Sequence, residues 1–194
     1  MSIFSFLLIA VSFICMSLLL MEFSFRTSLV ISGILFLLLF ILVGQAWPIA
    51  LASIKLISGW ISVLIIGILI PESTVTQQRL QSSEMGFRFI AALLFSIFVY
   101  VVSFELTVLF PIAIEFMIIG LLIFSLSLIV LAFSSNLTQQ IFAWQCGLIG
   151  FQIIYSPLEG SALIAAIFAL LHISISLLGS YAIIASLPEE GETV

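Results

Sequence analysis

The side chains that could carry chemistry in this chain lie within its apolar stretches. His172, the single histidine, lies near the middle of one stretch, and Gln145 and Gln152 lie on the stretch before it. Two residues that are one heptad apart share a face of a helix. A polar or ionisable group inside lipid must face protein or water. We therefore expect all three side chains to face the interior of the protein.

His172 has two interpretations. Histidine changes its charge near neutral pH and could pass a proton along a chain of water molecules. Alternatively, it is a neutral imidazole bonded to a carbonyl or to a neighbouring hydroxyl such as that of Ser174 or Ser176. By helical rise, His172 lies about 16 Å below the outer face and Gln145 about 10 Å from the opposite face. The two are thus at similar heights on successive helices, and we predict that they face each other or share a water molecule. Gln145 cannot ionise, and glutamines of this kind hold helices together or hold water.

Lys55 and Glu115 form a second candidate pair. Their distances from the same membrane face are about 9 Å and about 6 Å by helical rise. A buried ion pair is one way in which charges are tolerated inside a membrane. The alternative for Lys55 is to extend its flexible stem to the interface.

The sequence contains no recognisable catalytic constellation. It lacks Ser-His-Asp and Cys-His arrangements, paired carboxylates, a glycine-rich phosphate loop and metal-spaced histidines. Cys15 and Cys146 lie in apolar segments and are typical of small core residues. We therefore expect a protein that is not an enzyme and that has no metal or cofactor of its own.

Composition places the chain in the membrane. It is 64% hydrophobic and 7% charged, whereas soluble domains carry roughly 25% charged residues. The net charge of -5 comes largely from the turns and an acidic tail over 189–192, which argues against a nucleic-acid partner. Residues 1–20 lack the basic start and the cleavage site of a secretory signal, so we take them as a retained helix.

We predict an all-α fold, a polytopic transmembrane helix bundle that forms a single domain over 1–194. A crossing needs about 20 apolar residues, and seven segments meet this requirement. If the break from Glu105 to Pro111 does not form a hairpin, the count drops to six. The loop 71–87 and the tail 187–194 lie outside the membrane in this prediction. The expected spans are 3–21, 27–44, 49–70, 88–106, 111–133, 138–155 and 161–186.

Three basic residues suggest the orientation. With seven spans, Arg26, Arg79 and Arg88 fall on one side, and loops rich in positive charge are cytoplasmic as a rule. This places the N-terminus outside and the C-terminus in the cytoplasm, in a cell inner membrane or a thylakoid membrane.

The run Asn136-Leu137-Thr138-Gln139-Gln140-Ile141-Phe142-Ala143-Trp144, followed by Gly150, resembles the second-last helix of hydrogenase component E subunits. The C-terminal part of those proteins is related to the K-type subunit of respiratory complex I and to the C-type subunit of Mrp antiporters. The resemblance covers mainly residues 130–186. Lys55 also lies in a helix where component E proteins can carry a lysine.

The chain departs from this family at the positions of its acidic residues, which are implicated in proton transfer. The first acid would fall near Leu148 or at Gln145, and the second at or beside His172. The resemblance implies a membrane subunit whose proton path is altered or lost.

These observations favour a non-redox integral membrane subunit of a multisubunit energy-converting complex of the complex I, hydrogenase or Mrp type. It would support proton or cation translocation, or scaffold a larger antiporter-like subunit. The expected partners are other integral membrane subunits and lipids. Two alternatives remain open: an accessory membrane subunit of a pigment or electron-transfer complex, and a stand-alone small transporter.

Overall fold

A computed structural model describes residues 3–21, 24–71 and 82–186 of the chain, which form helices joined by short turns. Seven helices are present in these ranges. They are α1 (Ile3–Leu20), α2 (Phe25–Ala46), α3 (Ile49–Leu69), α4 (Ser82–Leu109), α5 (Ile114–Phe133), α6 (Leu137–Tyr155) and α7 (Ala162–Ala185).

The predicted all-α fold is confirmed, and a break separates the fourth and fifth helices, although it lies at 110–113 and not from Glu105 to Pro111, because Glu105 is still within α4. Helix α4 ends at Leu109 and α5 begins at Ile114, so the described part of the chain contains seven helices. The predicted start of the fourth span at 88 is too late, because α4 begins at Ser82. Glu84 in its first turn favours a helix N-terminus, so the helix continues beyond the apolar run. The rest of the predicted loop and the tail 187–194 lie outside the described residues.

Six of the seven helices are long and apolar enough to cross a membrane. Helix α6 is the exception, because its 19 residues include the glutamines that lower its hydropathy. It packs against α5, α7 and α2, so most of its surface faces protein. A helix in this position can carry amide side chains that a lipid-facing helix could not.

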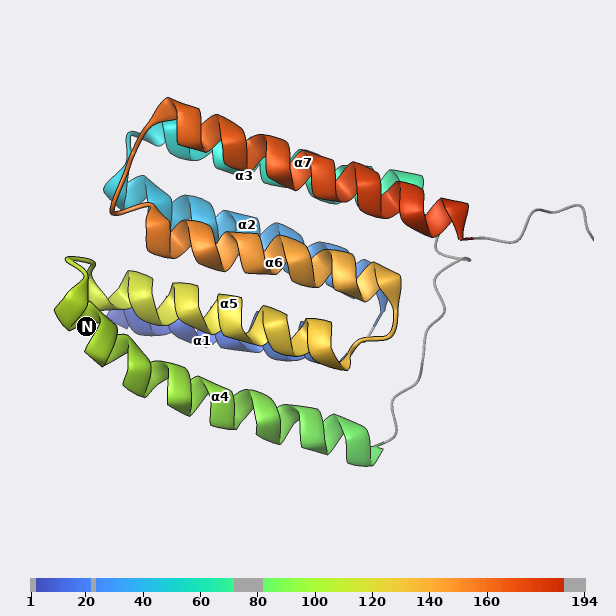
Figure 1. The fold of residues 1–194 in the computed structure, drawn as a ribbon, viewed down its shortest axis with the longest axis horizontal. Coiled ribbons are helices and arrows are strands. Elements are labelled where there is room, and N and C mark those ends of the chain that lie inside the picture. The colour runs from blue at the N-terminus through green and yellow to red at the C-terminus, as the bar shows by residue number, and fades with distance from the viewer. Residues whose placement is uncertain (1–2, 22–23, 72–81, 187–194) are drawn as a thin grey trace, which may run out of the picture.

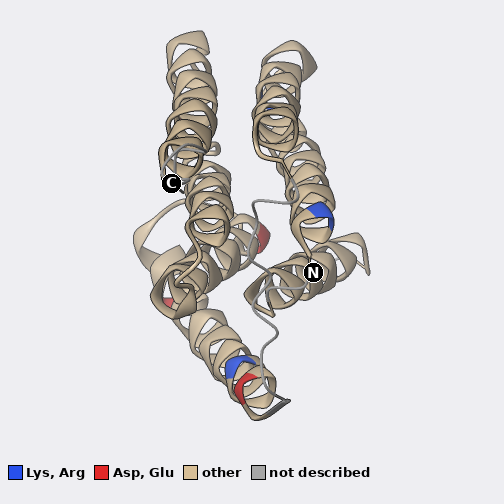
Figure 2. Ribbon diagram, turned by 90° about the vertical axis from the view of Figure 1, so that its right-hand side faces the viewer, with Lys and Arg blue, Asp and Glu red and all other residues tan. Residues whose placement is uncertain are grey.

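The helices form two rows that stand side by side (Figures 1 and 2). One row consists of α1, α2 and α3, and the other of α4, α5, α6 and α7. Across the rows α1 packs on α5, α2 on α6 and α3 on α7. Few positions on the ribbon are charged (Figure 2).

Every odd-numbered helix begins at the same end of the bundle (Figure 1). At this end, called the Trp47 end, the indole nitrogen of Trp47 donates to the carbonyl of Ser156 at 2.6 Å. At the opposite end, called the Arg88 end, Arg88 donates to the carbonyl of Leu20 at 3.0 Å. Arg26 begins α2 at this second end. The predicted placing of Arg26 and Arg88 on one side is therefore confirmed, whereas Arg79 lies outside the described residues.

Helices α5 and α6 approach each other closely because glycine occupies the contact. A Cβ atom at Gly150 would lie 2.5 Å from the backbone nitrogen of Phe124. Small residues allow such close backbone approach between membrane helices. The contact places the opposite face of α6, with its glutamines, towards α7 and α3.

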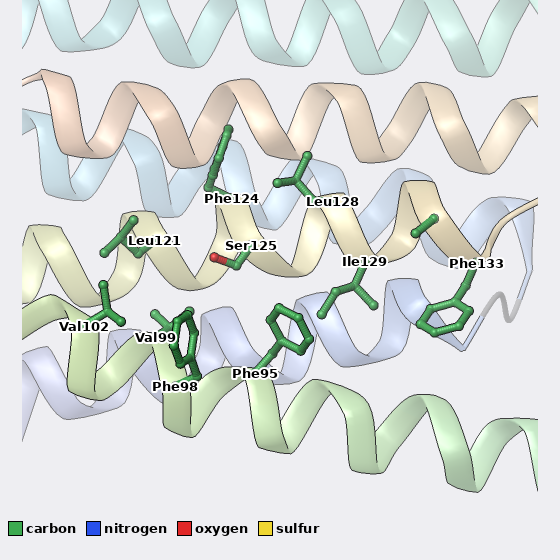
Figure 3. Close-up of a pocket in the computed structure, with 11 residues that line it drawn as sticks. Phe95, Phe98, Val99, Val102, Leu121, Phe124, Ser125, Leu128, Ile129 and Phe133 are labelled. Atoms are coloured by element: carbon green, nitrogen blue, oxygen red, sulfur yellow. The ribbon is translucent and has the colours of Figure 1, made fainter.

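Helix α4 stands at one end of its row (Figure 1) and leaves an apolar groove against α5 (Figure 3). The groove has a volume of about 560 Å³. Phe95 and Phe98 of α4 face Leu121 and Ile129 of α5 across it, and Ser125 is the polar side chain among its lining residues. An apolar surface of this kind suits contact with lipid or with another membrane helix.

Candidate functional site

Helix α6 carries the central side chains of the site. Asn136 caps its N-terminus by accepting a hydrogen bond from the backbone nitrogen of Thr138 at 3.0 Å. Two helical turns separate Gln145 from Gln152, and both are buried, as predicted. His172 on α7 is buried as well, with 2% of its surface exposed.

The predicted contact between His172 and Gln145 is confirmed. The ring Nδ1 of His172 is hydrogen-bonded to Gln145 Oε1. The amide nitrogen of Gln145 donates to the His172 carbonyl and to Ser176 Oγ, each at 2.8 Å. Ser174, the other hydroxyl considered as a partner, is exposed. The α6–α7 contact is therefore made by the glutamine, with Ser176 in support.

Gln152 bridges His172 to a third helix. Its Nε2 lies 2.5 Å from Nε2 of His172, and its Oε1 accepts from Nζ of Lys55 at 3.0 Å. The sequence placed Gln152 on the buried face but did not predict its bond to Lys55. A continuous polar row thus joins α3, α6 and α7.

Lys55 is enclosed rather than extended to an interface. Only 2% of its surface is exposed. Its ammonium nitrogen lies 4.4 Å from the ring centre of Trp47 and 5.0 Å from that of Phe168. Aromatic faces attract cations, most strongly where water is excluded. The two rings and the Gln152 oxygen together form a site for one ammonium group.

The predicted ion pair between Lys55 and Glu115 is wrong. The Glu115 carboxylate accepts a hydrogen bond from Ser5 of α1, whereas Lys55 bonds to Gln152. Helix α5 packs against α1, α4 and α6, and α3 packs against α2 and α7. The two charges are at similar depths, but their helices are not neighbours in the bundle.

The two ends of the row fix the direction of every hydrogen bond in it. A lysine ammonium can only donate and a backbone carbonyl can only accept. With its oxygen on Lys55, Gln152 turns its NH₂ group to His172, so the ring Nε2 accepts. The ring proton is then on Nδ1 and is donated to Gln145, whose NH₂ group reaches Ser176 and the carbonyl. The geometry corresponds to a neutral imidazole beside a charged lysine, and each hydrogen bond of the row then pairs one donor with one acceptor.

Three aromatic residues of the site were not identified from the sequence. Trp47 is buried against Lys55, with 5% of its surface exposed. Phe168 lies one turn before His172 on α7. Phe36 of α2 meets the His172 ring edge-on at 4.8 Å between centres, and Gly59 leaves room for it. The sequence places Phe168 and His172 on one face of a helix by their i, i+4 spacing, which could have identified Phe168. No such spacing relates Trp47 or Phe36 to His172.

Cys15 and Cys146 are buried and free, as the sequence indicated. Within residues 3–21, 24–71 and 82–186, no group of three or more His, Cys, Asp or Glu is placed to hold a metal ion. Both ring nitrogens of His172 are engaged by glutamines.

Comparison of the chain with protein-family models, curated proteins and solved structures finds no match.

Proposed function

We propose that this protein is a non-redox integral membrane subunit of a multisubunit energy-converting complex, in which Lys55 and His172 share a proton that moves during ion translocation. One observation carries the proposal: a lysine buried inside an apolar bundle is joined through a single amide to a buried histidine. The likeness of residues 130–186 to the complex I, hydrogenase and Mrp type of subunit supports the same class.

Holding helices together does not by itself require ionisable groups. Glutamine, serine and asparagine supply hydrogen bonds between membrane helices without a charge to desolvate. A charged residue in a membrane segment is costly and marks ion pathways and proton relays. Lys55 bonds to a neutral amide and two aromatic faces, and its charge is therefore only partly compensated. This arrangement favours a group that gains and loses a proton.

Gln152 gives the pair two states of equal total charge. In the first state, which matches the contacts in the structure, Lys55 carries the proton, the Gln152 oxygen faces it, and the His172 Nε2 accepts from the amide. In the alternative state an N–H bond is broken at Lys55 and one is formed at Nε2 of His172. A half-turn of the Gln152 amide then directs its oxygen to the ring and its NH₂ group to the neutral amine. The bond from Nδ1 to Gln145 is kept in both states, so the shift requires rearrangement at Gln152 alone.

The exposed apolar faces fit other membrane subunits or lipids as partners. Only 17% of the α4 span and 22% of the α7 span are buried. The positions of Arg26 and Arg88 at one end favour that end as the cytoplasmic side. We infer a multi-pass protein of an inner or thylakoid membrane with its N-terminus outside.

A role as the axial-ligand subunit of a pigment or electron-transfer complex is less well supported. Such a role requires a ring nitrogen of His172 to be available to the cofactor, and glutamines occupy both.

The test is a His172→Gln exchange in the chromosomal copy of the host. Glutamine keeps hydrogen-bonding capacity and removes titration. Native gels of membranes that contain the tagged chain measure assembly of the complex, and quenching of an acridine dye in inverted vesicles measures proton movement. We expect normal assembly and a loss of proton movement of about a hundredfold or more, the scale of a removed proton-transfer group. Trp144→Phe, on the outward face of α6, is the control and should resemble wild type.

Normal proton movement in fully assembled His172→Gln membranes would show that His172 only holds helices together. Migration of the tagged wild-type chain at its own mass would instead contradict membership of a complex and favour the stand-alone transporter.

A further inference from the structure

Three buried serine hydroxyls beside the site have no hydrogen-bond partner among the described residues. They belong to Ser32 on α2, Ser62 on α3 and Ser180 on α7, each with at most 1% of its surface exposed. Other serines within these helices, such as Ser58 of α3 and Ser176 of α7, donate to a carbonyl about one turn earlier. A buried hydroxyl left without a partner costs about 1–3 kcal/mol. These three therefore have unused capacity for a polar ligand.

The hydroxyls of α2 and α3 lie on the Arg88 side of His172. Phe36 touches the His172 ring, and Gly59 lies against Phe36, so both mark the height of the ring. Ser32 is four residues before Phe36 and Ser62 is three residues after Gly59. Since α2 runs opposite to α3 (Figure 1), both steps lead towards the Arg88 end, by about 5–6 Å at the helical rise.

On α7 the same direction leads through Ser176 to Ser180. These two residues follow His172 at intervals of one turn, and both are completely buried. Ser176 is the last member of the polar row, and Ser180 lies about 6 Å farther along the helix. Ser180 is five residues from the last residue of α7, which places it about 8 Å from the Arg88 end.

We propose that Ser32, Ser62 and Ser180 bind a short file of water molecules that continues the polar row from Ser176 to the Arg88 end. Water supplies both donors and acceptors, and buried waters typically make about three hydrogen bonds to otherwise unsatisfied polar groups. The completed row begins at Lys55, about 9 Å from the Trp47 end at the helical rise, and it reaches the aqueous phase at the other end. Its role as a proton path rests on the proposed function, whereas the presence of the water does not.

Thiol accessibility tests the file directly. Ser62→Cys and Ser180→Cys are near-isosteric and can be made in full-length chains that carry Cys15→Ala and Cys146→Ala. The variants are reconstituted in liposomes and exposed to Ag⁺, a thiol ligand of nearly the size of water. The thiols that remain free are then counted with a maleimide after denaturation. We expect both cysteines to react about tenfold or more faster than the controls, because thiol reactivity follows access to water.

The controls are Ser17→Cys and Leu64→Cys. Ser17 is an unpartnered serine whose hydroxyl is buried, with 7% of the residue's surface exposed, and it lies on α1, outside the three helices of the file. Leu64 lies on α3 with 60% of its surface exposed to the surroundings of the bundle. Reaction at positions 62 and 180 no faster than at position 17 would overturn the proposal.

A second measurement covers the case in which the cysteine-free background does not fold. Transfer of magnetisation from water to ¹³C-labelled serines of the wild-type chain in bilayers should reach Ser62 and Ser180 sooner than Ser17. Assignment uses single Ser→Ala exchanges, and equal build-up rates would again overturn the file.

If water reaches both serines while His172→Gln pumps normally, the file stands and the proposed function fails. If His172→Gln stops proton movement while the serines stay dry, the reverse holds.

Discussion

Replacement of Gln152 by leucine should leave two buried groups without their partner. The ammonium of Lys55 loses its hydrogen bond of 3.0 Å and keeps the ring faces of Trp47 and Phe168. The Nε2 atom of His172 loses its donor at the same time. Both groups are 2% exposed, so water cannot replace the amide without opening the bundle.

The size of the effect follows from the charge of Lys55. Stranding one member of a buried charged contact costs about 3–5 kcal/mol. A neutral acceptor without its donor, as at His172, adds about 1 kcal/mol. We therefore expect Gln152→Leu to lower the free energy of unfolding by about 4 kcal/mol or more on these two values.

The double variant Lys55→Met, Gln152→Leu separates the two contributions. Methionine removes the charge, so only the loss at His172 should remain, about 1 kcal/mol. The double variant should then be more stable than Gln152→Leu alone. The assay is unfolding in mixed micelles of increasing dodecyl sulfate content, followed by tryptophan fluorescence and circular dichroism.

Gln139 offers a matched control at the other end of α6. It is a buried glutamine bonded to the carbonyl of Leu19, about 20 Å from Gln152 along the helix. Effects of Lys55→Met and Gln139→Leu should add, as is usual for distant sites. If Lys55→Met and Gln152→Leu also add, Lys55 is not held by Gln152 in the membrane and reaches an interface instead.

Three further predictions concern packing, the turn and orientation. Gly150→Ala should cost about 3 kcal/mol, because its Cβ would meet the Phe124 backbone at 2.5 Å, whereas Gly33→Ala, with nothing within 4 Å, should be neutral or stabilising in the same unfolding assay. Trp47→Phe keeps a ring over the lysine but loses the indole bond to the α6 C-terminus, so thermal unfolding should show a loss of about 1 kcal/mol; no change would mean that this bond is absent. Alkaline phosphatase fused after Val194 should be inactive, since this reporter works only outside the cytoplasm, and high activity would reverse the assigned orientation.

Depth along a helix was the most reliable information in the sequence. It predicted the contact of His172 with Gln145 because these residues lie on consecutive antiparallel helices, where equal height implies proximity. The same argument failed for Lys55 and Glu115 because their helices are not consecutive. Which helices become neighbours across the two rows depends on packing, and hydropathy says little about it.

The aromatic part of the site was beyond sequence reasoning for a related reason. Trp47 lies next to Pro48 at a helix boundary, where membrane proteins often place interfacial tryptophans. It is buried because the turn after α6 passes over it. A Cβ atom at Gly160 in this turn would lie 3.1 Å from the ring nitrogen of Trp47. That contact joins positions more than a hundred residues apart, and no local pattern encodes it.

Helix α4 sets the parity of the whole chain. Three helices precede it and three follow it, so one extra crossing makes the second triplet start at the same end as the first. Without that crossing α7 would be antiparallel to α3. Lys55, near the start of α3, would then lie beside the C-terminal end of α7. The fold therefore needs one crossing between the two triplets, and it does not depend on the side chains of α4, few of which are buried. An unrelated apolar helix of similar length should serve as the spacer, whereas deletion of α4 would turn the second triplet upside down and separate Lys55 from Gln152.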